Sequence, residues 1–409
     1  MFNFDRAITV LADLGDTDGA GLCTRKIQSA IDRCCQEGGG TIRIPPGTWY
    51  TGALTLRSRV KLHIEKGAVV KFSTRFEDYL PVVFTRFEGI ECYNYRALLY
   101  ANGCRNIAIA GEGVIDGQGA AWWPWKKLQH TAARKLYDAE YLGIPVGRRA
   151  FGTVQDALRP SLLQPINCTQ VLVEGITLRN SPMWTLHPVY CRDVVIRNVK
   201  VYGEGPNTDG INPDSCDGVR IEDCFISTGD DCIAIKSGMN EDGRRVGKPC
   251  RNIEVRNCRM QNGHGGVVIG SDTSGDIRNV LVRDCTFIGT SRGIRLKSMR
   301  GRGGIVENII YRNISMQDIA YEAIVLDMQY GSSTVEPRTS EPPVFRDITL
   351  ESISCRGCGR RAIDVRGIAE SPIVNLTLKN IDISKAGRDT SYEYCEGLIR
   401  QNVVVDAGR

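Results

Sequence analysis

Short stretches that alternate between apolar and polar residues recur along the chain. The stretch CRNIAIAG from Cys104 returns as CTQVLVEGI from Cys168, CRDVVIRNV from Cys191, CDGVRIEDC from Cys216 and CRNIEVRNC from Cys250, and weaker copies begin at Ile277, Val306, Phe345 and Ile373. In each copy the fourth and sixth positions are apolar or nearly so, and the seventh and eighth are mostly polar. This period of two is typical of a short strand that ends in a turn.

The spacing of the copies predicts how the strands are arranged. From Cys168 onward, successive copies start between 23 and 39 residues apart, and no helical period fits between them. A unit of this size cannot bury its own apolar face, so it must stack on its neighbours. We therefore predict an all-β fold, a single-stranded right-handed parallel β-helix, with equivalent residues of adjacent coils ~4.8 Å apart.

The same stacking accounts for many of the 16 cysteines. The first five copies all begin with cysteine, so these side chains should form one internal ladder, with Cys224, Cys258 and Cys285 in a second ladder. No spacing matches a paired zinc-ligand pattern, and Cys355 and Cys358 form a lone CxxC. We expect small buried thiols in a reducing compartment.

Two segments interrupt the repeat. Residues 24–36, TRKIQSAIDRCCQ, have the pattern of an amphipathic helix that stops at three glycines, and they should form an N-terminal cap within residues 20–40. Residues 117–163 form a long insertion of helical character that carries Trp122, Trp123 and Trp125. No linker divides the chain, so we expect residues 1–409 to form one domain.

Composition and charge exclude several classes of protein. The chain has 52 Lys and Arg against 47 Asp and Glu, a formal net charge of +5, which is too weak a signal for nucleic-acid binding. No stretch approaches the ~20 apolar residues of a membrane span, and the first residues do not resemble a signal peptide. We expect a cytoplasmic protein, or a secreted one if a leader has been removed, with no nucleic-acid or membrane partner.

The candidate chemistry lies on the second strand of each coil. The relevant strings are MWTLHPV from Met183, TDGINPD from Thr208, DDCIAIK from Asp230, HGGVVIG from His264 and SRGIRLK from Ser291. Aligning their inward-facing apolar positions places the other residues in outward-facing columns. The columns are Trp184, Asp209, Asp231, Gly265 and Arg292; Thr208, Asp230, His264 and Ser291; His187, Asn212, Ala234, Val268 and Arg295; and Asp214, Lys236, Gly270 and Lys297.

These columns bring three carboxylates, an imidazole and several cations to one patch. Because clustered carboxylates repel, the pKa of at least one of them should rise, so that it keeps a proton near neutral pH. A protonated carboxyl beside an ionised one can cleave a glycosidic bond by general acid and general base catalysis. Arg295 and Lys297 could hold an anionic group of the substrate. The alternative is that the aspartates cap turns and the cations form an ordinary solvated face.

Four of these strings carry a family resemblance. Asn207-Thr208-Asp209, Gly229-Asp230-Asp231, Gly263-His264-Gly265 and Arg295-Leu296-Lys297 resemble, in the same order, the signature motifs of glycoside hydrolase family 28, the polygalacturonases. The strings EDYLPVVFTRFEGIECYNY from Glu77 and RNSPMWTLHPVYC from Arg179 are similar to those of the bacterial branch, many of whose members are exo-acting.

The resemblance implies metal-independent, inverting hydrolysis of α-1,4-galacturonide bonds with no cofactor. Asp230 would be the general acid, Asp209 and Asp231 would hold and activate the water, and His264 would support the protonation of the acid. Arg295 and Lys297 would bind the galacturonate carboxylate. The complete expected substrate-binding set is Asn207, Arg295, Lys297, Tyr330, His187, Trp184 and Lys236.

The leading hypothesis is therefore an exo-acting galacturonidase whose partner is an acidic oligo- or polysaccharide, galacturonan. The 117–163 insertion could wall off one end of a cleft, and its tryptophans could stack on a sugar or simply pack the insertion. A branched pectin such as rhamnogalacturonan or xylogalacturonan remains an alternative substrate. A Ca²⁺-dependent lyase of the pectate lyase type and a non-catalytic carbohydrate-binding or adhesin β-helix are alternatives of other classes.

Overall fold

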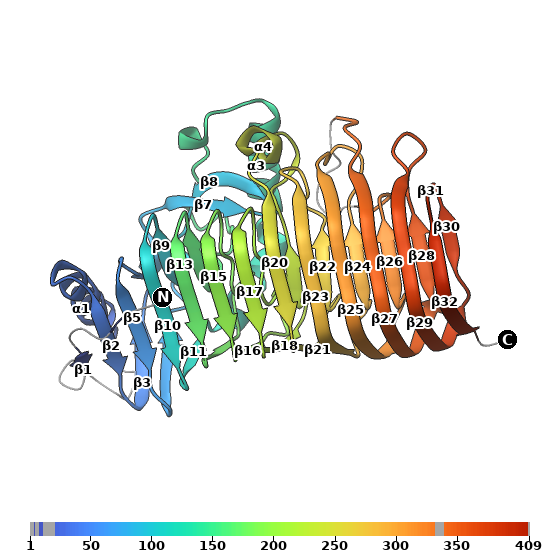
Figure 1. The fold of residues 1–409 in the computed structure, drawn as a ribbon. Coiled ribbons are helices and arrows are strands. Elements are labelled where there is room, and N and C mark those ends of the chain that lie inside the picture. Colours follow the sequence, from blue (N-terminus) through green and yellow to red (C-terminus); the bar gives the residue numbers. More distant parts are fainter. Residues whose placement is uncertain (1–3, 5–7, 11–20, 332–338, 408–409) are drawn as a thin grey trace.

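Strands of successive coils lie side by side in the computed structural model, which describes residues 4, 8–10, 21–331 and 339–407 (Figure 1). The coils pair in parallel: Val171 stands opposite Val194, and Val194 opposite Val219. The chain forms a right-handed parallel β-helix, so the fold predicted from the repeat is confirmed.

Three faces make up each coil. The first face consists of β2 (Gly40–Ile44), β5 (Val60–Ile64), β10 (Arg105–Gly111), β13 (Thr169–Glu174), β15 (Arg192–Arg197), β17 (Asp217–Glu222) and β20 (Cys250–Arg256), with β1 (Ile8–Val10) at its edge. The second consists of β3 (Gly47–Thr51), β6 (Ala68–Phe72), β11 (Val114–Asp116), β14 (Thr177–Arg179), β16 (Lys200–Tyr202), β18 (Phe225–Thr228) and β21 (Arg259–Asn262).

In the C-terminal coils a single bent strand crosses both of these faces. These strands are β23 (Ile277–Ile288), β25 (Ile305–Ile319), β27 (Val344–Arg361) and β29 (Ile373–Arg388), and β31 (Cys395–Glu396) and β32 (Ile399–Ala407) pair with the last of them. The third face consists of β4 (Leu54–Thr55), β9 (Leu99–Asn102), β12 (Leu163–Ile166), β19 (Ile233–Ile235), β22 (Val267–Gly270), β24 (Ile294–Lys297), β26 (Ile324–Asp327), β28 (Ile363–Arg366) and β30 (Ser391–Glu393).

The polar eighth position of each sequence repeat marks the corner between the first and second faces. Its residue has a positive φ in every copy; examples are Asn198 at 51°, Asp223 at 57° and Gly175 at 75°. Asn, Asp and Gly tolerate this left-handed conformation better than other residues do. The turn geometry therefore explains why a polar residue or glycine ends each apolar stretch.

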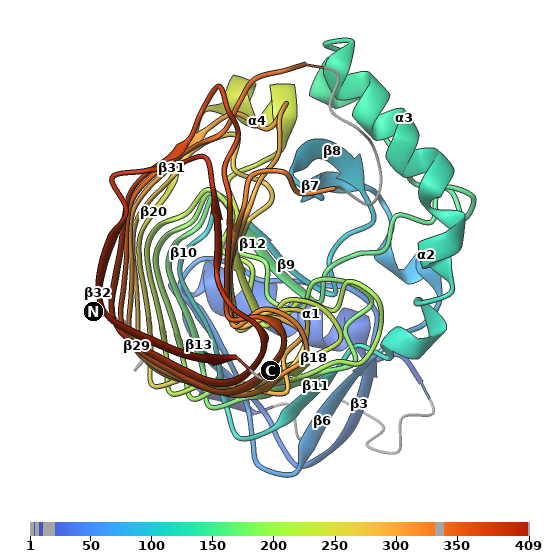
Figure 2. The same cartoon turned by 90° about the vertical axis from the view of Figure 1, so that its right-hand side faces the viewer.

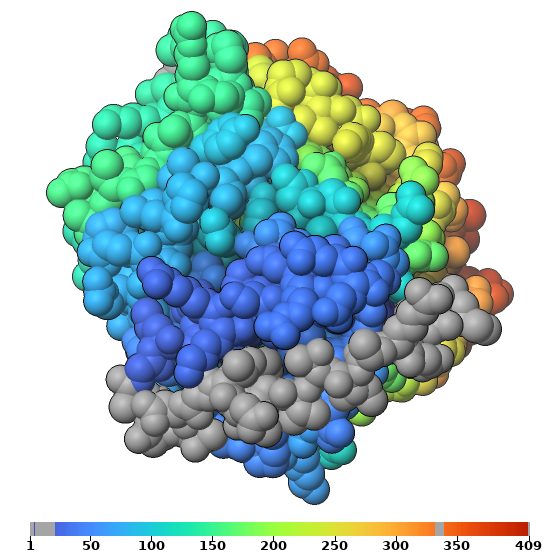
Figure 3. All heavy atoms as spheres, turned by 90° about the vertical axis from the view of Figure 1, so that its left-hand side faces the viewer, coloured from blue at the N-terminus to red at the C-terminus, as the bar shows by residue number. Residues whose placement is uncertain are grey.

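The core is built from the inward-facing positions of the stacked strands. The buried apolar cluster runs from Cys23 to Ala386, and it includes the ladder Cys104, Cys168, Cys191, Cys216 and Cys250. The predicted helix is α1 (Thr24–Gln36), which buries Ile27 and Ile31 against the first coil. Figure 3 shows this end of the molecule, where the dark blue N-terminal residues cover the stack.

A hairpin and three further α-helices stand outside the coils. They are β7 (Val83–Phe87) and β8 (Ile90–Asn94), which pair antiparallel, α2 (Trp125–Leu128), α3 (His130–Tyr141) and α4 (Asn240–Val246), together with the 3₁₀ turns η2 (Phe76–Tyr79), η3 (Gly119–Ala121) and η4 (Val146–Arg148). In the view along the stack, the hairpin, α3 and α4 lie on the same side of the coils (Figure 2). Within the described ranges, every helix is too short or too polar to cross a membrane.

Candidate active site

A cleft of about 720 Å³ opens on the third face. Its floor comes from the segments that lead into β19, β22 and β24, which carry Asp230 and Asp231, His264 and Arg292, and from Asp209 on the preceding coil. Its walls come from the hairpin tip at Glu88, from Tyr137 of α3 and from Met239 before α4. Gly89 at this tip has a φ of 81°, and its carbonyl accepts a hydrogen bond from Met239 N at 3.1 Å, so the hairpin is fixed against the segment that leads into α4.

The predicted columns of outward-facing residues are present. Thr185 N donates to Asp209 O at 2.8 Å, and Gly210 N donates to Asp231 O at 3.1 Å, so these coils stack in the expected register. One carboxylate oxygen each of Asp209, Asp230 and Asp231 can be chosen so that all three lie within 4.8 Å of one another. The three side chains differ in exposure, because 19% of Asp230 is accessible against 4% of Asp209 and 1% of Asp231.

Cations surround the two buried carboxylates. Lys297 Nζ lies 2.8 Å from one oxygen of Asp231, and Arg295 Nη1 lies 3.3 Å from the other. Lys236 Nζ lies 3.8 Å from Asp209. Burial opposes the ionisation of Asp231, but Lys297 and Arg295 together hold its pKa below the ordinary value.

The titration of Asp209 is shifted in the opposite direction. Burial, reinforced by the negative charge of Asp230, raises the pKa of Asp209 to about 8, because Lys236 compensates only part of the effect. The predicted rise in the pKa of one carboxyl group is thus present. It falls on Asp209 and not on Asp230, the position that the family motif identifies with the acid.

Asp230 is paired with His264. The imidazole Nδ1 lies 3.0 Å from Asp230 Oδ1, and this hydrogen bond raises the pKa of His264. Burial would raise the pKa of Asp230, but the contact with His264 keeps it below the ordinary value. Because the three carboxylates are so close, a proton held near neutral pH belongs to the cluster as a whole, and Asp209 is the member whose pKa is raised.

Most of the expected substrate-binding residues border the cleft. Asn207, Trp184, Lys236 and Tyr330 all line it, together with Arg295 and Lys297. Lys236 Nζ lies 4.6 Å from the centre of the Trp184 ring, and the Arg295 and Lys297 head groups lie 5.5 and 5.3 Å from the centre of the Tyr330 ring.

The prediction that His187 binds substrate is wrong. His187 is fully buried beneath the cleft, where its Nε2 lies 3.3 Å from Asp214 and its Nδ1 lies 3.0 Å from Gln164. Its strand position does face outward, as predicted. The hairpin covers that position, because Arg86 of β7 reaches down to pair with Asp214 at 2.8 Å.

The tryptophans of the insertion pack against other residues and do not line the cleft. Trp122 and Trp125 meet edge to face with ring centres 5.0 Å apart, and Trp122 contacts Tyr79 of η2 at 5.3 Å. Trp123 donates its indole N–H to Ser181 O at 3.0 Å. The packing interpretation is therefore confirmed.

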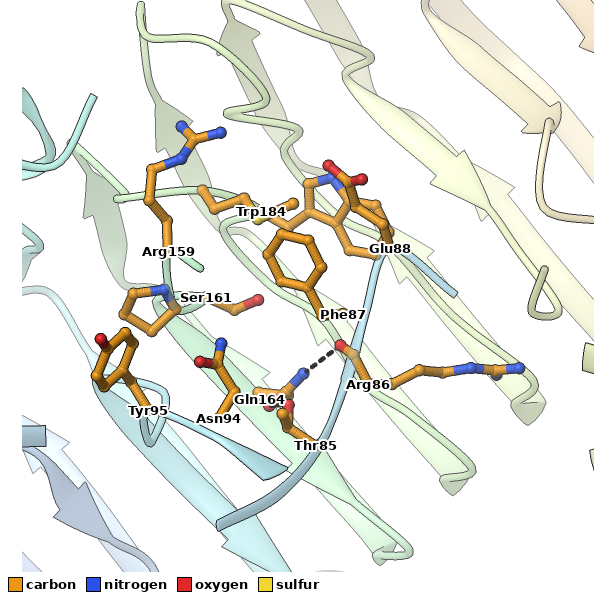
Figure 4. A pocket seen from close by; sticks show the side chains of 12 residues that line it. Thr85, Arg86, Phe87, Glu88, Asn94, Tyr95, Arg159, Ser161, Gln164 and Trp184 are labelled. Atoms are coloured by element: carbon orange, nitrogen blue, oxygen red, sulfur yellow. Dashed lines mark hydrogen bonds between the residues drawn. The ribbon is translucent and has the colours of Figure 1, made fainter. Parts of the chain in front are cut away.

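Sequence reasoning missed the residues that reach the site from outside the repeat. Arg159 is 1% exposed; its guanidinium donates to Gln129 Oε1 at 3.0 Å, to Pro206 O at 2.8 Å and to Asn207 Oδ1 at 2.8 Å. It thereby ties the insertion to the loop that carries Asp209. Figure 4 shows Arg159, Glu88 and Trp184 above the buried Gln164, which donates to the carbonyl of Arg86 at 3.4 Å. No periodic pattern in the sequence marks these contacts.

The donor set does not suit a calcium ion. Ca²⁺ takes six to eight oxygen ligands. Both oxygens of Asp231 already contact cationic side chains, and Lys236 lies between Asp209 and Asp272, at 3.8 and 4.0 Å. A divalent cation would have to displace these ammonium and guanidinium groups, so the chemistry of the site disfavours the lyase alternative.

Comparison with known proteins agrees with this geometry. The profile of glycosyl hydrolases family 28 matches residues 151–403. A "Probable polygalacturonase" of Vitis vinifera is 31% identical over 399 residues, which are 92% of this chain and 74% of that protein.

Solved structures extend the likeness to the whole fold. The hyperthermoactive exopolygalacturonase of Thermotoga maritima is 36% identical with a TM-score of 0.93, and the match covers 99% of this chain and 93% of that one. The family 28 exopolygalacturonase of Yersinia enterocolitica is 25% identical with a TM-score of 0.76, over 98% of this chain and 78% of that one.

Proposed function

Because the chain belongs to glycosyl hydrolases family 28, we propose that it hydrolyses the α-1,4-galacturonide bonds of pectin-derived galacturonan as an exo-acting enzyme. One observation carries the chemistry: three carboxylates meet within 4.8 Å in a cleft whose cations can receive the carboxylate of an acidic sugar. The exopolygalacturonases similar to this chain support the exo mode.

Asp230 is the group that donates the proton to the glycosidic oxygen. It is the most exposed of the three aspartates. His264 beside it can form a hydrogen bond with Asp230 whether that carboxyl group is ionised or protonated. When substrate enters, the proton of the cluster moves from Asp209 to Asp230. The bond between the anomeric carbon and the leaving oxygen then breaks as that oxygen takes the proton.

Asp209 and Asp231 hold the attacking water. Lys297 and Arg295 keep Asp231 ionised, and Asp209 becomes ionised when its proton has passed to Asp230. One of the two accepts a proton from the water as the oxygen attacks the anomeric carbon from the face opposite the leaving group. The expected product therefore has an inverted anomeric configuration, which proton NMR of the first turnovers can measure.

The walls of the cleft support exo action. The hairpin, α3 and the segment before α4 all contribute residues to the rim, and a long polymer would have to pass these elements to bind with both ends free. We infer that the enzyme accepts a chain end and releases galacturonic acid.

The test is to incubate the protein with trigalacturonate and with polygalacturonate, with and without EDTA, and to separate the early products. We expect saturated galacturonic acid from the outset and no effect of EDTA. Longer oligomers as first products would contradict exo action, and an EDTA-sensitive, ultraviolet-absorbing unsaturated product would indicate a lyase. Cleavage of branched pectin alone would reassign the substrate, and binding without turnover would favour a non-catalytic protein.

A further inference from the structure

One buried cation at the cleft has no charged partner. Arg302 lines the cleft and is 1% exposed, yet within the described ranges it forms no ion pair. Its Nη1 donates to Asn240 Oδ1, and its Nε has no hydrogen-bond partner. A buried guanidinium in this condition is costly, because it has lost water without gaining a carboxylate.

The other buried cations of the described cleft are already paired. Arg295 and Lys297 contact Asp231, and Lys236 lies near Asp209 and Asp272. Arg302 therefore differs from them in having its charge available for a ligand. Since the ligand enters a cleft that already holds acidic side chains, a cation free of ion pairs is the group best able to attract an anion.

The surrounding structure fixes Arg302 in place. Arg244 Nη1 donates to the carbonyls of Gly301 and Arg302 at 2.9 and 3.0 Å, and Thr273 Oγ1 donates to Gly303 O at 3.1 Å. The backbone that carries Arg302 is thus held on both sides. Ordering a flexible cation would cost binding free energy, and this loop avoids that cost.

The partner of its side chain is fixed as well. Asn240 donates its Nδ2 to Glu140 Oε1 of α3 at 3.0 Å, which turns its Oδ1 toward Arg302. The inserted helix α3 and helix α4 therefore position the guanidinium from outside the β-helix. Arg302 belongs to the same wall of the cleft as the elements that we connect with exo action.

We propose that Arg302 binds the carboxylate of one uronate unit of the substrate, at a position separate from the one served by Arg295 and Lys297. This inference rests on the proposed function, since it assumes an acidic saccharide in the cleft. An arginine fork can bind both oxygens of a carboxylate, and esterification of that carboxylate removes its charge. Arg302 thus makes the enzyme selective for an unesterified unit at this position.

A cycle of two ligand changes and one protein change tests the proposal. Digalacturonate and its two monomethyl esters, one on each sugar unit, are titrated calorimetrically into the protein with Asp230→Asn, which slows turnover, and into the same protein with Arg302→Gln added. We expect one of the two esters to bind roughly 10- to 100-fold more weakly than the free acid when Arg302 is present. When Arg302→Gln is added, that ester should bind to the variant nearly as tightly as the free acid does.

The matched control is Arg300→Gln. Arg300 lies two residues away, is about half exposed, pairs with Glu370 and does not border the cleft. It should leave both ester penalties unchanged. Arg302→Lys, which keeps the charge but not the fork, should retain part of the penalty, and thermal unfolding of each variant separates a binding effect from misfolding.

The outcomes distinguish this inference from the proposed function. Equal ester penalties with and without Arg302 would overturn the role of Arg302, even if the wild-type protein cleaves trigalacturonate. Binding by the wild-type protein without cleavage would overturn the proposed hydrolysis, while the cycle would still report on Arg302. Failure of the wild-type protein to bind either the acid or its esters would overturn both.

Discussion

Asp230 differs from its two neighbouring carboxylates in facing the cleft. Replacement by asparagine keeps the shape of the side chain and removes the proton that the leaving oxygen needs. We expect Asp230→Asn to lower kcat on trigalacturonate by roughly 10²- to 10⁴-fold, the range of a general acid, and to change KM much less. Initial rates of galacturonic acid release measure both constants.

The control for this substitution is Asp223→Asn. Asp223 is an exposed corner residue with a φ of 57°, a conformation that asparagine also tolerates, so its replacement should leave kcat within twofold of wild type. If Asp230→Asn retains more than a tenth of the activity, the acid is another residue, and Asp209, whose pKa is raised, becomes the candidate.

Asp209 should make the protein less stable as the pH rises. Its pKa is raised to about 8 in the folded state by burial and by Asp230, whereas an unfolded aspartate titrates near pH 4. Between these values the folded state holds a proton that the unfolded state has lost, so the free energy of unfolding falls with pH, by at most roughly 1.4 kcal/mol per pH unit. Asp209→Asn should make the slope less steep in urea unfolding measured from pH 5 to pH 8, although Glu140, whose pKa is raised to about 7, still contributes to it.

Asp231→Asn provides the comparison of opposite sign. Burial is outweighed by Lys297 and Arg295, which lower the pKa of Asp231, so its contribution is present above pH 4 and is lost as the pH falls. Its replacement should therefore leave the slope above pH 5 unchanged. An equal loss of slope in both variants would contradict the assignment of the proton to Asp209.

At the scale of the element, the hairpin β7–β8 is attached to the coils by a buried ion pair. Arg86 Nη1 lies 2.8 Å from Asp214 Oδ1, and neither side chain is exposed. Arg86→Met would leave Asp214 buried and unpaired beside His187, so we expect it to lower the free energy of unfolding by about 3–5 kcal/mol. Chemical denaturation at pH 7 measures the change.

An exposed pair of the same type serves as the control for this loss of unfolding free energy. Arg346 on β27 pairs with Glu307 of β25, and 44% of the arginine side chain is accessible to solvent. Arg346→Met should cost only about 0–1 kcal/mol. Similar losses in the two variants would show that burial does not set the strength of the Arg86 pair.

Periodic parts of the site were predictable from the sequence, and contacts from outside the repeat were not. The columns that hold Asp209, Asp231 and Arg295 were predictable, because strand side chains alternate with a period of two and each coil repeats the register. The burial of His187 was not, since its cover comes from Arg86, and Arg86 and Asp214 are 128 residues apart. The same holds for Arg159 and Arg302, which reach the site from an insertion and from a loop without periodicity.

The position of the proton was also beyond the sequence. The spacing of the aspartates predicted a cluster and therefore one raised pKa, as found. Which carboxyl carries the proton depends on His264 being 3.0 Å from Asp230 and on Lys236 being 3.8 Å from Asp209. Such differences in side-chain distance are set by packing and cannot be predicted from the order of residue types along the chain.

At the scale of the whole molecule, the stack of coils determines the chemistry of the cysteines. All 16 are free thiols, and 14 of them are buried; Cys35 and Cys395 are partly exposed. Burial raises the pKa of the Cys232 thiol, beside the catalytic cluster, to about 12. A reagent cannot reach the buried thiols, even one such as Cys168, whose pKa is lowered by hydrogen bonds from neighbouring thiols, so these thiols should be inert while the coils remain stacked.

The native protein should therefore react with a thiol reagent at its partly exposed cysteines first. With an excess of dithionitrobenzoate at pH 8, Cys35 and Cys395 should react within minutes and the buried thiols only at the rate at which coils open, whereas all 16 should react at once in guanidinium chloride. A reductant should leave the melting temperature unchanged, since no disulfide links these cysteines. Fast labelling of most thiols in the native state would mean that the coils open independently of global unfolding, and a fall in melting temperature with reductant would reveal a disulfide. A cytoplasmic location stays a prediction.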